Sequence, residues 1–129
     1  MSVEENKSLI LSLYTARMQR NFAILDQIVS PDFTTIVPGS PQPLRGPQGI
    51  KQSFMASQNA FPDFTIAIND QIAEGDKVVI IYTASGTSAV QMMGMPAGQH
   101  LKMMGIDIWQ VVNNKIVSCF GISQPVPNM

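Results

Sequence analysis

The chain has 129 residues and a net charge of −1, with 45% of its residues hydrophobic and only 13% charged. This length suits one domain with its own core, so we expect a single domain over residues 1–129. Because Lys and Arg form no cluster, the composition predicts no nucleic-acid partner. The polar N-terminus, and the lack of any run of about 18 apolar residues, favour a cytoplasmic protein that does not enter membranes.

Residues that bind metals or form disulfides are sparse. Cys119 is the single cysteine and His100 the single histidine, and neither has a second ligand at chelating spacing. We therefore expect no disulfide within the chain, no bound metal and no cofactor. No basic residue adjoins Cys119 to ionise its thiol, which favours an inert buried cysteine over a nucleophile. His100 is expected at an exposed loop or strand end.

Two helices are predicted at the start of the chain. Ser2 can cap a helix over residues 3–19, where residues recur at helical spacing. The residues at this spacing are Leu9, Ile10, Leu13, Tyr14, Arg17 and Met18. The pattern restarts at Asn21 and predicts a short second helix that ends before Pro31, because the residue before a proline avoids the helical conformation.

A strand, a loop and a third helix are predicted next. Residues 33–37 have the composition of a strand, and residues 38–43 are too rich in proline for regular structure. We expect this loop to border an opening. Pro47 suits the first turn of a helix that finishes near Asn59. The expected buried stripe of this helix is Ile50, Phe54 and Met55.

The remaining sequence predicts two antiparallel hairpins. In the first hairpin, a strand ends before residues 74–76 and a second strand begins with the run 78–82. This run has apolar residues at both odd and even positions, so we expect both of its faces to be covered. The residues of one parity in its first strand are Phe64, Ile66, Ile68 and Ile72. After a methionine-rich loop at 91–98, the second hairpin joins residues 101–112 and 115–122 across two asparagines.

Helices first and long antiparallel strands second predict an α+β fold with helices on one face of a bent sheet. Periodicity alone leaves open whether that sheet forms a cone or stays open. Several short sequence segments, spread over nearly the whole chain, resemble those of the SnoaL-like polyketide cyclase branch of the nuclear transport factor 2 superfamily. They are Phe61-Pro62-Asp63-Phe64, Glu74-Gly75-Asp76-Lys77-Val78-Val79, Thr83-Ala84-Ser85-Gly86-Thr87, Gly94-Met95-Pro96-Ala97-Gly98, Gly105-Ile106-Asp107-Ile108-Trp109 and Asn113-Asn114-Lys115-Ile116-Val117.

The resemblance implies a cone-shaped curved antiparallel sheet with N-terminal helices packed around a hydrophobic pocket, a fold also called cystatin-like. It also implies a small hydrophobic ligand and a homodimer that pairs through the outer face of the sheet. The superfamily includes cyclases, ketosteroid isomerases, dehydratases, epoxide hydrolases and binding modules, so the fold does not decide the function.

Three positions depart from the cyclase pattern. SnoaL-like cyclases carry a histidine after the Gly-Thr pair, an arginine after the tryptophan, and a His-Trp-Asp-like run in the last strand. Here the sequence has Ser88, Gln110 and Cys119-Phe120-Gly121. The acid/base aspartate of the family therefore aligns with Gly121, which cannot move a proton.

Asp107 is the best candidate for chemistry because it lies in an otherwise apolar strand, and carboxylates are rarely buried without a partner. Burial would raise its pKa and could keep it as a neutral hydrogen-bond donor. Tyr14, on the buried side of the first helix, could join it in an oxyanion hole, as in the ketosteroid isomerases that the chain resembles. The alternatives are a carboxylate that only holds its strand and an aromatic ring that only fills the core. The isomerase's general base aligns with about Val37.

We expect a pocket lined by small last-strand residues and by bulky apolar ones. The expected lining is Trp109, Met103, Cys119, Gly121, Phe54, Met92 and Met95. The methionines around the second hairpin could form a flexible lid, fill the core or cover a dimer face.

Three functions stay open. The first is a cofactor-independent cyclase or isomerase that acts on a small hydrophobic carbonyl compound by enolate chemistry, with Asp107 and Tyr14 as catalytic residues. The second is a binding protein without catalysis on the same fold. The third is an enzyme similar to the ketosteroid isomerases or to the epoxide hydrolases.

Overall fold

A capping box starts the first helix. In the computed structural model, which describes residues 2–35, 43–91 and 96–126, Ser2 Oγ accepts the backbone N–H of Glu5 at 3.0 Å. Glu5 Oε1 in turn accepts the N–H of Ser2 at 3.2 Å. These bonds satisfy amides that no helical carbonyl can reach. The helix α1 (Val3–Gln19) has the predicted bounds.

The second helical segment is shorter than predicted. It consists of a 3-10 turn (Phe22–Ile24) and α2 (Leu25–Ile28), and strand β1 (Val29–Thr35) begins at once. Pro31 therefore lies inside a strand and not after a helix. The pairing of β1 with its neighbour is interrupted between Val29 and Thr34, so the missing N–H of proline falls in a gap of the ladder.

Six further elements complete the described chain: β2 (Leu44–Arg45), α3 (Gly46–Ala60), β3 (Thr65–Glu74), β4 (Lys77–Thr87), β5 (His100–Val112) and β6 (Lys115–Pro125). The six strands form one sheet in the order β2-β1-β6-β5-β4-β3. All pairs are antiparallel except β1 with β6, which is parallel. The sheet is therefore mixed, where the sequence analysis expected a purely antiparallel one.

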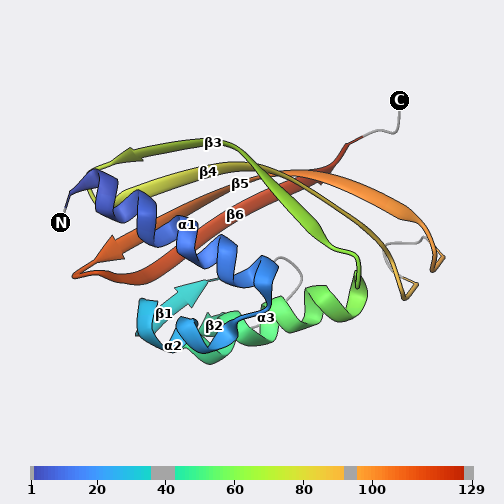
Figure 1. Ribbon diagram of the computed structural model, residues 1–129, viewed down its shortest axis with the longest axis horizontal. Coiled ribbons are helices and arrows are strands. Elements are labelled where there is room, and N and C mark those ends of the chain that lie inside the picture. The colour runs from blue at the N-terminus through green and yellow to red at the C-terminus, as the bar shows by residue number, and fades with distance from the viewer. Residues whose placement is uncertain (1, 36–42, 92–95, 127–129) are drawn as a thin grey trace.

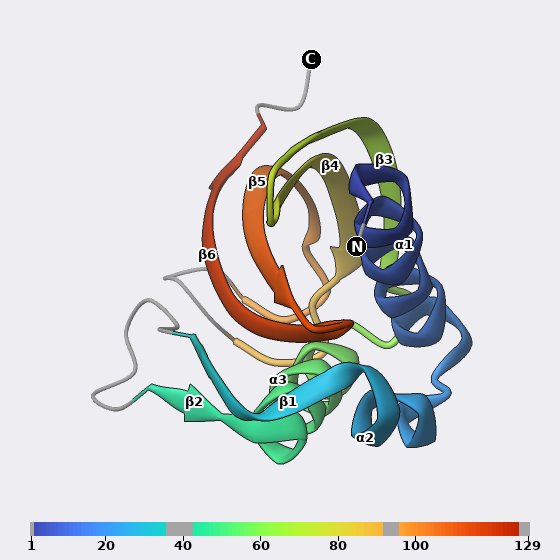
Figure 2. The same cartoon turned by 90° about the vertical axis from the view of Figure 1, so that its left-hand side faces the viewer.

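The sheet curls and the helices occupy its concave side. Figure 1 shows α1 running beneath the long strands, and Figure 2 shows the strands curving around the helices without closing. The buried cluster joins α1, α2, α3 and the concave face of the strands; it contains Ile10, Leu13, Leu25, Val29, Phe33, Ile50, Val78, Ile80, Trp109, Val111 and Ile116 among others. This is the α+β fold class that the sequence predicted.

Both predicted hairpins are present. β3 and β4 meet at Gly75-Asp76, and β5 and β6 meet at Asn113-Asn114. The two asparagines have φ values of 50° and 62°. Left-handed backbone at both turn positions is the two-residue geometry that matches the twist of the strands, and asparagine adopts it readily.

A bulge in β3 overturns one prediction about the faces of the sheet. The register of β3 with β4 shifts between Ile68 and Asp70. Ile66 consequently packs toward the core, whereas Ile72 is 52% exposed on the convex face. A bulged residue changes the parity of every residue after it, so the four apolar residues of this strand do not share one face.

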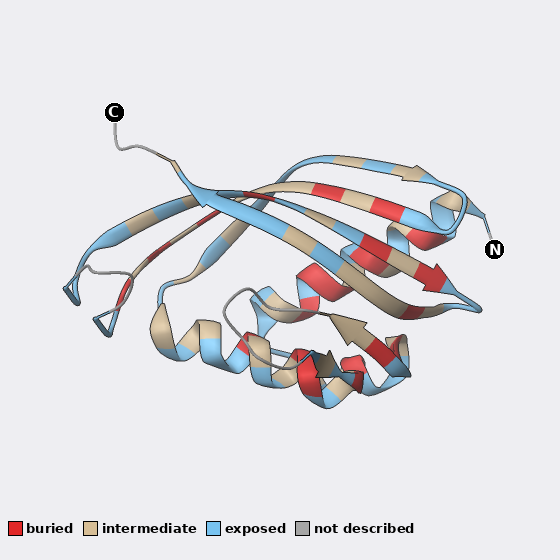
Figure 3. Cartoon of the chain, turned by 180° about the vertical axis from the view of Figure 1, so that it is seen from behind, coloured by how far each residue is buried: buried red, intermediate tan, exposed pale blue. Residues whose placement is uncertain are grey.

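The convex face of the sheet is largely open in the described chain. Figure 3 shows mostly exposed and half-buried residues along this side of the long strands. Its exposed large side chains include Ile72, Met104, Ile106, Ile108, Phe120 and Ile122. Within the run 78–82, Val78 and Ile80 are buried, whereas Val79 and Ile81 on the opposite face are half-buried. A single copy of the chain therefore covers the second face only in part. No described helix is long and apolar enough to cross a membrane.

We expect α1 to be held mainly by its buried leucine. Leu13 is 1% exposed and Leu11 is 37% exposed, so the same substitution on one helix separates packing from helix propensity. Leu13→Ala should lower the free energy of unfolding by about 2–5 kcal/mol. Leu11→Ala should change it by less than about 1 kcal/mol. Urea denaturation followed by circular dichroism measures both, and equal effects would contradict this account of the core.

Candidate functional site

Tyr14 and Asp107 meet inside the curled sheet. Tyr14 Oη, from the middle of α1, donates a hydrogen bond of 2.5 Å to Asp107 Oδ2 on β5. Trp109 Nε1 donates to Tyr14 Oη at 2.9 Å. The tyrosine hydroxyl thus accepts from the indole and donates to the carboxylate, and its single proton is directed at Asp107.

Alternation along β5 places the carboxyl on the concave face. Asp107 and Trp109 are two residues apart and therefore point to the same side. The Trp109 ring stacks on Phe33 at 6.4 Å between centroids and meets the Tyr14 ring edge-on at 6.0 Å. Tyr14 and Trp109 are both buried. Packing in the core holds the two aromatic donors, and the Tyr14 hydroxyl in turn holds the carboxyl group.

Gly121 makes room for the carboxyl. It pairs with Asp107 across the β5–β6 ladder, and a Cβ atom at position 121 would lie 2.5 Å from Asp107 Oδ1. The family's last-strand acid aligns with this position. A side chain at 121 and the Asp107 carboxyl cannot occupy the same space, so the neighbouring strand supplies the interior acid.

The electrostatics of the interior act on Asp107 in two directions. Burial raises the pKa of its carboxyl above the ordinary value, while the Tyr14 hydrogen bond and the Arg17 charge oppose that rise. Burial is also the main cause that raises the pKa of Tyr14, followed by the charge of Asp107. Burial, followed by the same carboxylate, raises the pKa of Tyr82 to about 12. Both phenols therefore keep their protons at neutral pH, and the carboxyl is the group able to exchange one.

Arg17 is a site residue that the sequence analysis did not single out. Its guanidinium lies 4.6 Å from the centroid of the Phe54 ring and 4.5 Å from that of Phe64. Nη2 donates to Ser57 Oγ at 3.2 Å. The signal in the sequence was a cation, three residues after Tyr14, at a position of the first helix where the other residues of the same spacing are mostly apolar.

The other residues expected around the pocket are spread over the concave side. Phe54 is buried on α3, and its ring lies 6.1 Å from that of Phe22. Met103 is half-buried and pairs with Ala84. Met92, Met95 and Val37 lie outside the described residues.

The remaining titratable candidates offer no activated group. Burial, and next the Asp107 charge, raise the pKa of the half-buried Cys119 thiol, so this thiol is neutral. His100 is exposed, with Nδ1 3.4 Å from Thr87 Oγ1. In the described ranges, no group of three or more His, Cys, Asp or Glu residues is arranged to hold a metal ion.

Two of the positions that depart from the cyclase pattern lie apart from the Tyr14–Asp107 pair. Gln110 is hydrogen-bonded elsewhere, and the Ser88 hydroxyl is buried without a hydrogen-bond partner in the described chain. Gln110 Nε2 donates to Asp76 Oδ2 at 2.7 Å, at the turn between β3 and β4. Ser88 is buried, and its backbone N–H donates to the Gln99 carbonyl at 2.9 Å. Neither contacts the Tyr14–Asp107 pair in the described chain.

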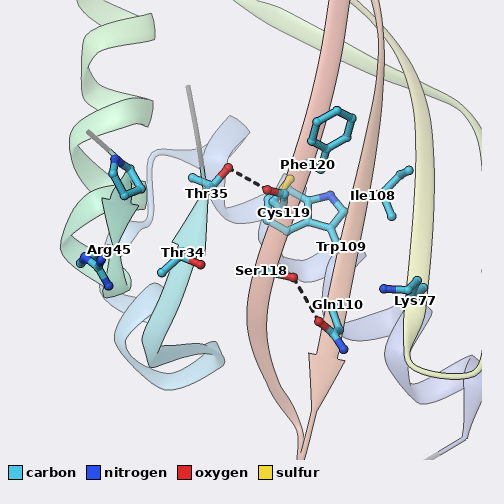
Figure 4. A pocket seen from close by; sticks show the side chains of 11 residues that line it. Thr34, Thr35, Arg45, Lys77, Ile108, Trp109, Gln110, Ser118, Cys119 and Phe120 are labelled. Carbon is cyan, nitrogen blue, oxygen red and sulfur yellow. Dashed lines mark hydrogen bonds between the residues drawn. The ribbon is translucent and has the colours of Figure 1, made fainter. Parts of the chain in front are cut away.

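A separate groove of about 460 Å³ lies beside β1 and β6. Figure 4 shows Arg45 at one side of it and Lys77 at the other, with Ser118 between them. Trp109 lines both the groove and the interior site, but Tyr14 and Asp107 do not line the groove. The groove carries cations and hydroxyls and has no carboxylate in its lining.

Comparisons with known proteins agree with this architecture. IdmH of Streptomyces antibioticus, a proposed polyketide cyclase, is 26% identical with a TM-score of 0.79, over 92% of this chain and 91% of that one. A proposed polyketide cyclase of Acidithiobacillus ferrooxidans is also 26% identical, with a TM-score of 0.76 over 96% of this chain and 92% of that one. AclR of Streptomyces galilaeus, a proposed hydroxylase, has the same fold at 22% identity, with a TM-score of 0.77 and coverage of 95% and 91%.

A comparison with curated proteins found no match. The family model described as SnoaL-like polyketide cyclase matches residues 8–126. Because that match spans nearly the whole chain and the fold agrees, the protein belongs to the SnoaL-like polyketide cyclase family.

Proposed function

We propose that the protein is a cofactor-independent cyclase or isomerase that acts on a small, largely hydrophobic carbonyl compound. The observation that carries this proposal is the half-buried Asp107 carboxyl, held through Oδ2 by the 2.5 Å bond from Tyr14. Because Oδ2 of this carboxyl accepts the bond from Tyr14, Oδ1 is the oxygen that could contact a ligand. Its raised pKa brings it closer to the range in which a group can both take and return a proton.

In the proposed reaction, Asp107 Oδ1 removes a proton from the carbon next to the substrate carbonyl. The C–H electron pair becomes the C=C bond of an enolate, and the carbonyl oxygen takes the negative charge. In a cyclisation, the enolate carbon then attacks a second carbonyl, and the new alkoxide receives the proton from Asp107. In an isomerisation, the proton returns to another carbon of the enolate. Both routes restore the carboxylate.

Tyr14 acts in this scheme as a positioning residue. The sequence analysis expected it to donate directly to the ligand, but its proton is already directed at Asp107. A phenol that donates to a carboxylate favours the ionised form. Tyr14 therefore supports the base form of Asp107 and fixes which oxygen faces the substrate.

Replacement of the carboxyl should abolish proton transfer. We expect the wild-type protein to accelerate exchange of the α-protons of 2-tetralone in D₂O, a hydrophobic ketone chosen as probe. Asp107→Asn should slow this exchange by roughly 100-fold or more, since the amide cannot accept the proton. Asp32→Asn, which changes an exposed carboxylate of β1, is the matched control. Proton NMR measures the exchange, and an unchanged rate in Asp107→Asn would contradict the assignment.

The pH dependence should identify the base. Because the carboxylate is the active form, kcat/KM should fall as the pH falls through the pKa of Asp107, which lies above the ordinary aspartate value. Tyr14→Phe removes a hydrogen bond that lowers this pKa, so the acid limb should move to higher pH. Rate profiles from pH 4 to 9 test both points. An acid limb that stays in place in Tyr14→Phe would show that Tyr14 does not tune Asp107.

A binding protein without catalysis is the second candidate. It is favoured by Gly121, which stands where the family's acid aligns, and by Gln110, which bonds Asp76 at 2.7 Å. Native mass spectrometry of the purified protein can reveal a co-purifying compound. A compound that is bound equally by the wild type and Asp107→Asn, and converted by neither, would support this candidate.

We also propose that two copies pair through the convex face of the sheet. Phe120 and Ile122 are 62% and 63% exposed there, and an apolar groove of about 350 Å³ lies between them and Met104. Burial of such side chains stabilises association, and a net charge of −1 gives little repulsion between copies. A second copy presents the same surface and so satisfies a two-fold interface.

A cation on the convex face should separate the copies. Ile122→Lys places a charge at the centre of the proposed interface and should reduce the mass in solution to that of one 14.1 kDa chain. Met55→Lys is the matched control, because Met55 is 52% exposed on α3, away from this face. Size-exclusion chromatography with light scattering measures the mass. A wild type that is monomeric at 100 µM would exclude the dimer.

A further inference from the structure

Arg17 has more hydrogen-bond donors than partners among the described residues. A guanidinium carries five N–H donors, and one hydrogen bond from Arg17, to Ser57 Oγ at 3.2 Å, is present among the described residues. Neither ion pair in the described part of the chain involves it. The centroids of the Phe54 and Phe64 rings lie 4.6 and 4.5 Å from Cζ of Arg17. An aromatic ring attracts a cation but carries no net charge, so the charge of the guanidinium is not neutralised.

The position of Arg17 ties it to the proposed site. It follows Tyr14 by three residues on α1, which is less than one turn and about 4.5 Å along the helix axis. Its charge acts on Asp107, Tyr82 and Tyr14, the acidic groups of the interior, yet burial is the stronger influence and lowers its pKa. No carboxylate of the described residues lies at ion-pair distance from Arg17. An anion supplied by a ligand would therefore offset the cost of burying this charge.

We propose that Arg17 is a specificity-determining residue that binds a carboxylate of the substrate, so that the protein takes apolar carbonyl compounds that also bear a carboxylate. The planar guanidinium forms two parallel hydrogen bonds with a carboxylate. Phe54 and Phe64 hold its plane and supply apolar surface for the ligand's hydrocarbon. Since Arg17 and Asp107 are not in contact, the acid of the ligand and its reacting carbon would lie at different ends of the site.

This inference rests on the proposed function only for the reacting end of the ligand, and binding tests it without turnover. The probes are 4-cyclohexylbutanoate and its amide, which have nearly the same shape and differ in charge. Trp109 is the single tryptophan of the chain and bonds Tyr14 in the site, so its fluorescence reports occupancy. We expect the wild type to bind the carboxylate at least tenfold more tightly than the amide.

Two charge-removing variants locate the preference. Arg17→Met keeps an apolar stem against Phe54 and should bind both probes equally, with the amide affinity unchanged. Arg17→Gln keeps a donor for Ser57 and serves if the methionine variant does not fold. Arg45→Met removes the same charge from the groove beside β1 and should keep the full preference.

Four results would overturn the proposal. They are equal binding of the two probes by the wild type, no saturable binding of either probe, a preference that survives in the folded Arg17 variant, and a preference lost in Arg45→Met. The last result would place the anion in the groove. Asp107→Asn should keep the carboxylate preference, so a failure of the proposed proton transfer leaves this test intact.

Discussion

The hydrogen bond between Tyr14 and Asp107 joins the first helix to the centre of the sheet, and the interior is organised around it. A carboxyl on a concave strand face loses solvation, and that loss must be offset by partners. Tyr14 offsets it directly, and a hydrogen bond to a charged group contributes about 1.5–3 kcal/mol. Trp109 holds the tyrosine oxygen from the other side at 2.9 Å. The bond therefore forms only when the core packs α1 and β5 at the correct distance from one another.

The sheet provides the space for this arrangement through small residues at cross-strand positions. Gly121 faces the Asp107 carboxyl, and Gly105 faces the Tyr82 ring closely enough that a side chain there would overlap it. Both positions need glycine because a Cβ atom would overlap the facing side chain. Backbone conformation is not the reason, since neither glycine has a positive φ. Where the family pattern has an acid on the last strand, this chain has a gap on that strand and an acid on its neighbour.

Local patterns predicted most of the fold because they report local physics. The capping residue Ser2, the helical spacing of α1 and the Asn113-Asn114 turn each act over a few residues, and each was read correctly from the sequence. The parallel pairing of β1 with β6 and the bulge after Ile68 depend on contacts between distant residues. A bulge reverses parity without any change in composition, which is why Ile72 does not share a face with Ile66 although their spacing in the sequence is even.

The site was partly predictable for a related reason. Asp107 and Tyr14 were found because a carboxylate in an apolar strand and a tyrosine on a buried helix stripe are locally unusual, but the direction of the Tyr14 proton depends on Asp107 being within 2.5 Å. Arg17 was overlooked because arginine stems often pack on apolar surfaces while the charge reaches water. Here the guanidinium itself lies against aromatic rings, 4.6 Å from the Phe54 centroid and 4.5 Å from that of Phe64.

Arg17 and Asp107 carry opposite charges in one interior, and the proposed acid/base reaction depends on their staying apart. Two opposite charges in a poorly hydrated space attract one another, and direct contact would neutralise both and leave neither for a ligand. In this structure each charge is held by a different partner, Ser57 for the guanidinium and Tyr14 for the carboxyl. Under the two proposals, this separation leaves Asp107 as the base at one end and Arg17 as the anion receptor at the other. A ligand that carries a carboxylate and an acidic carbon would satisfy both ends at once, and its binding would orient the carbon toward Asp107.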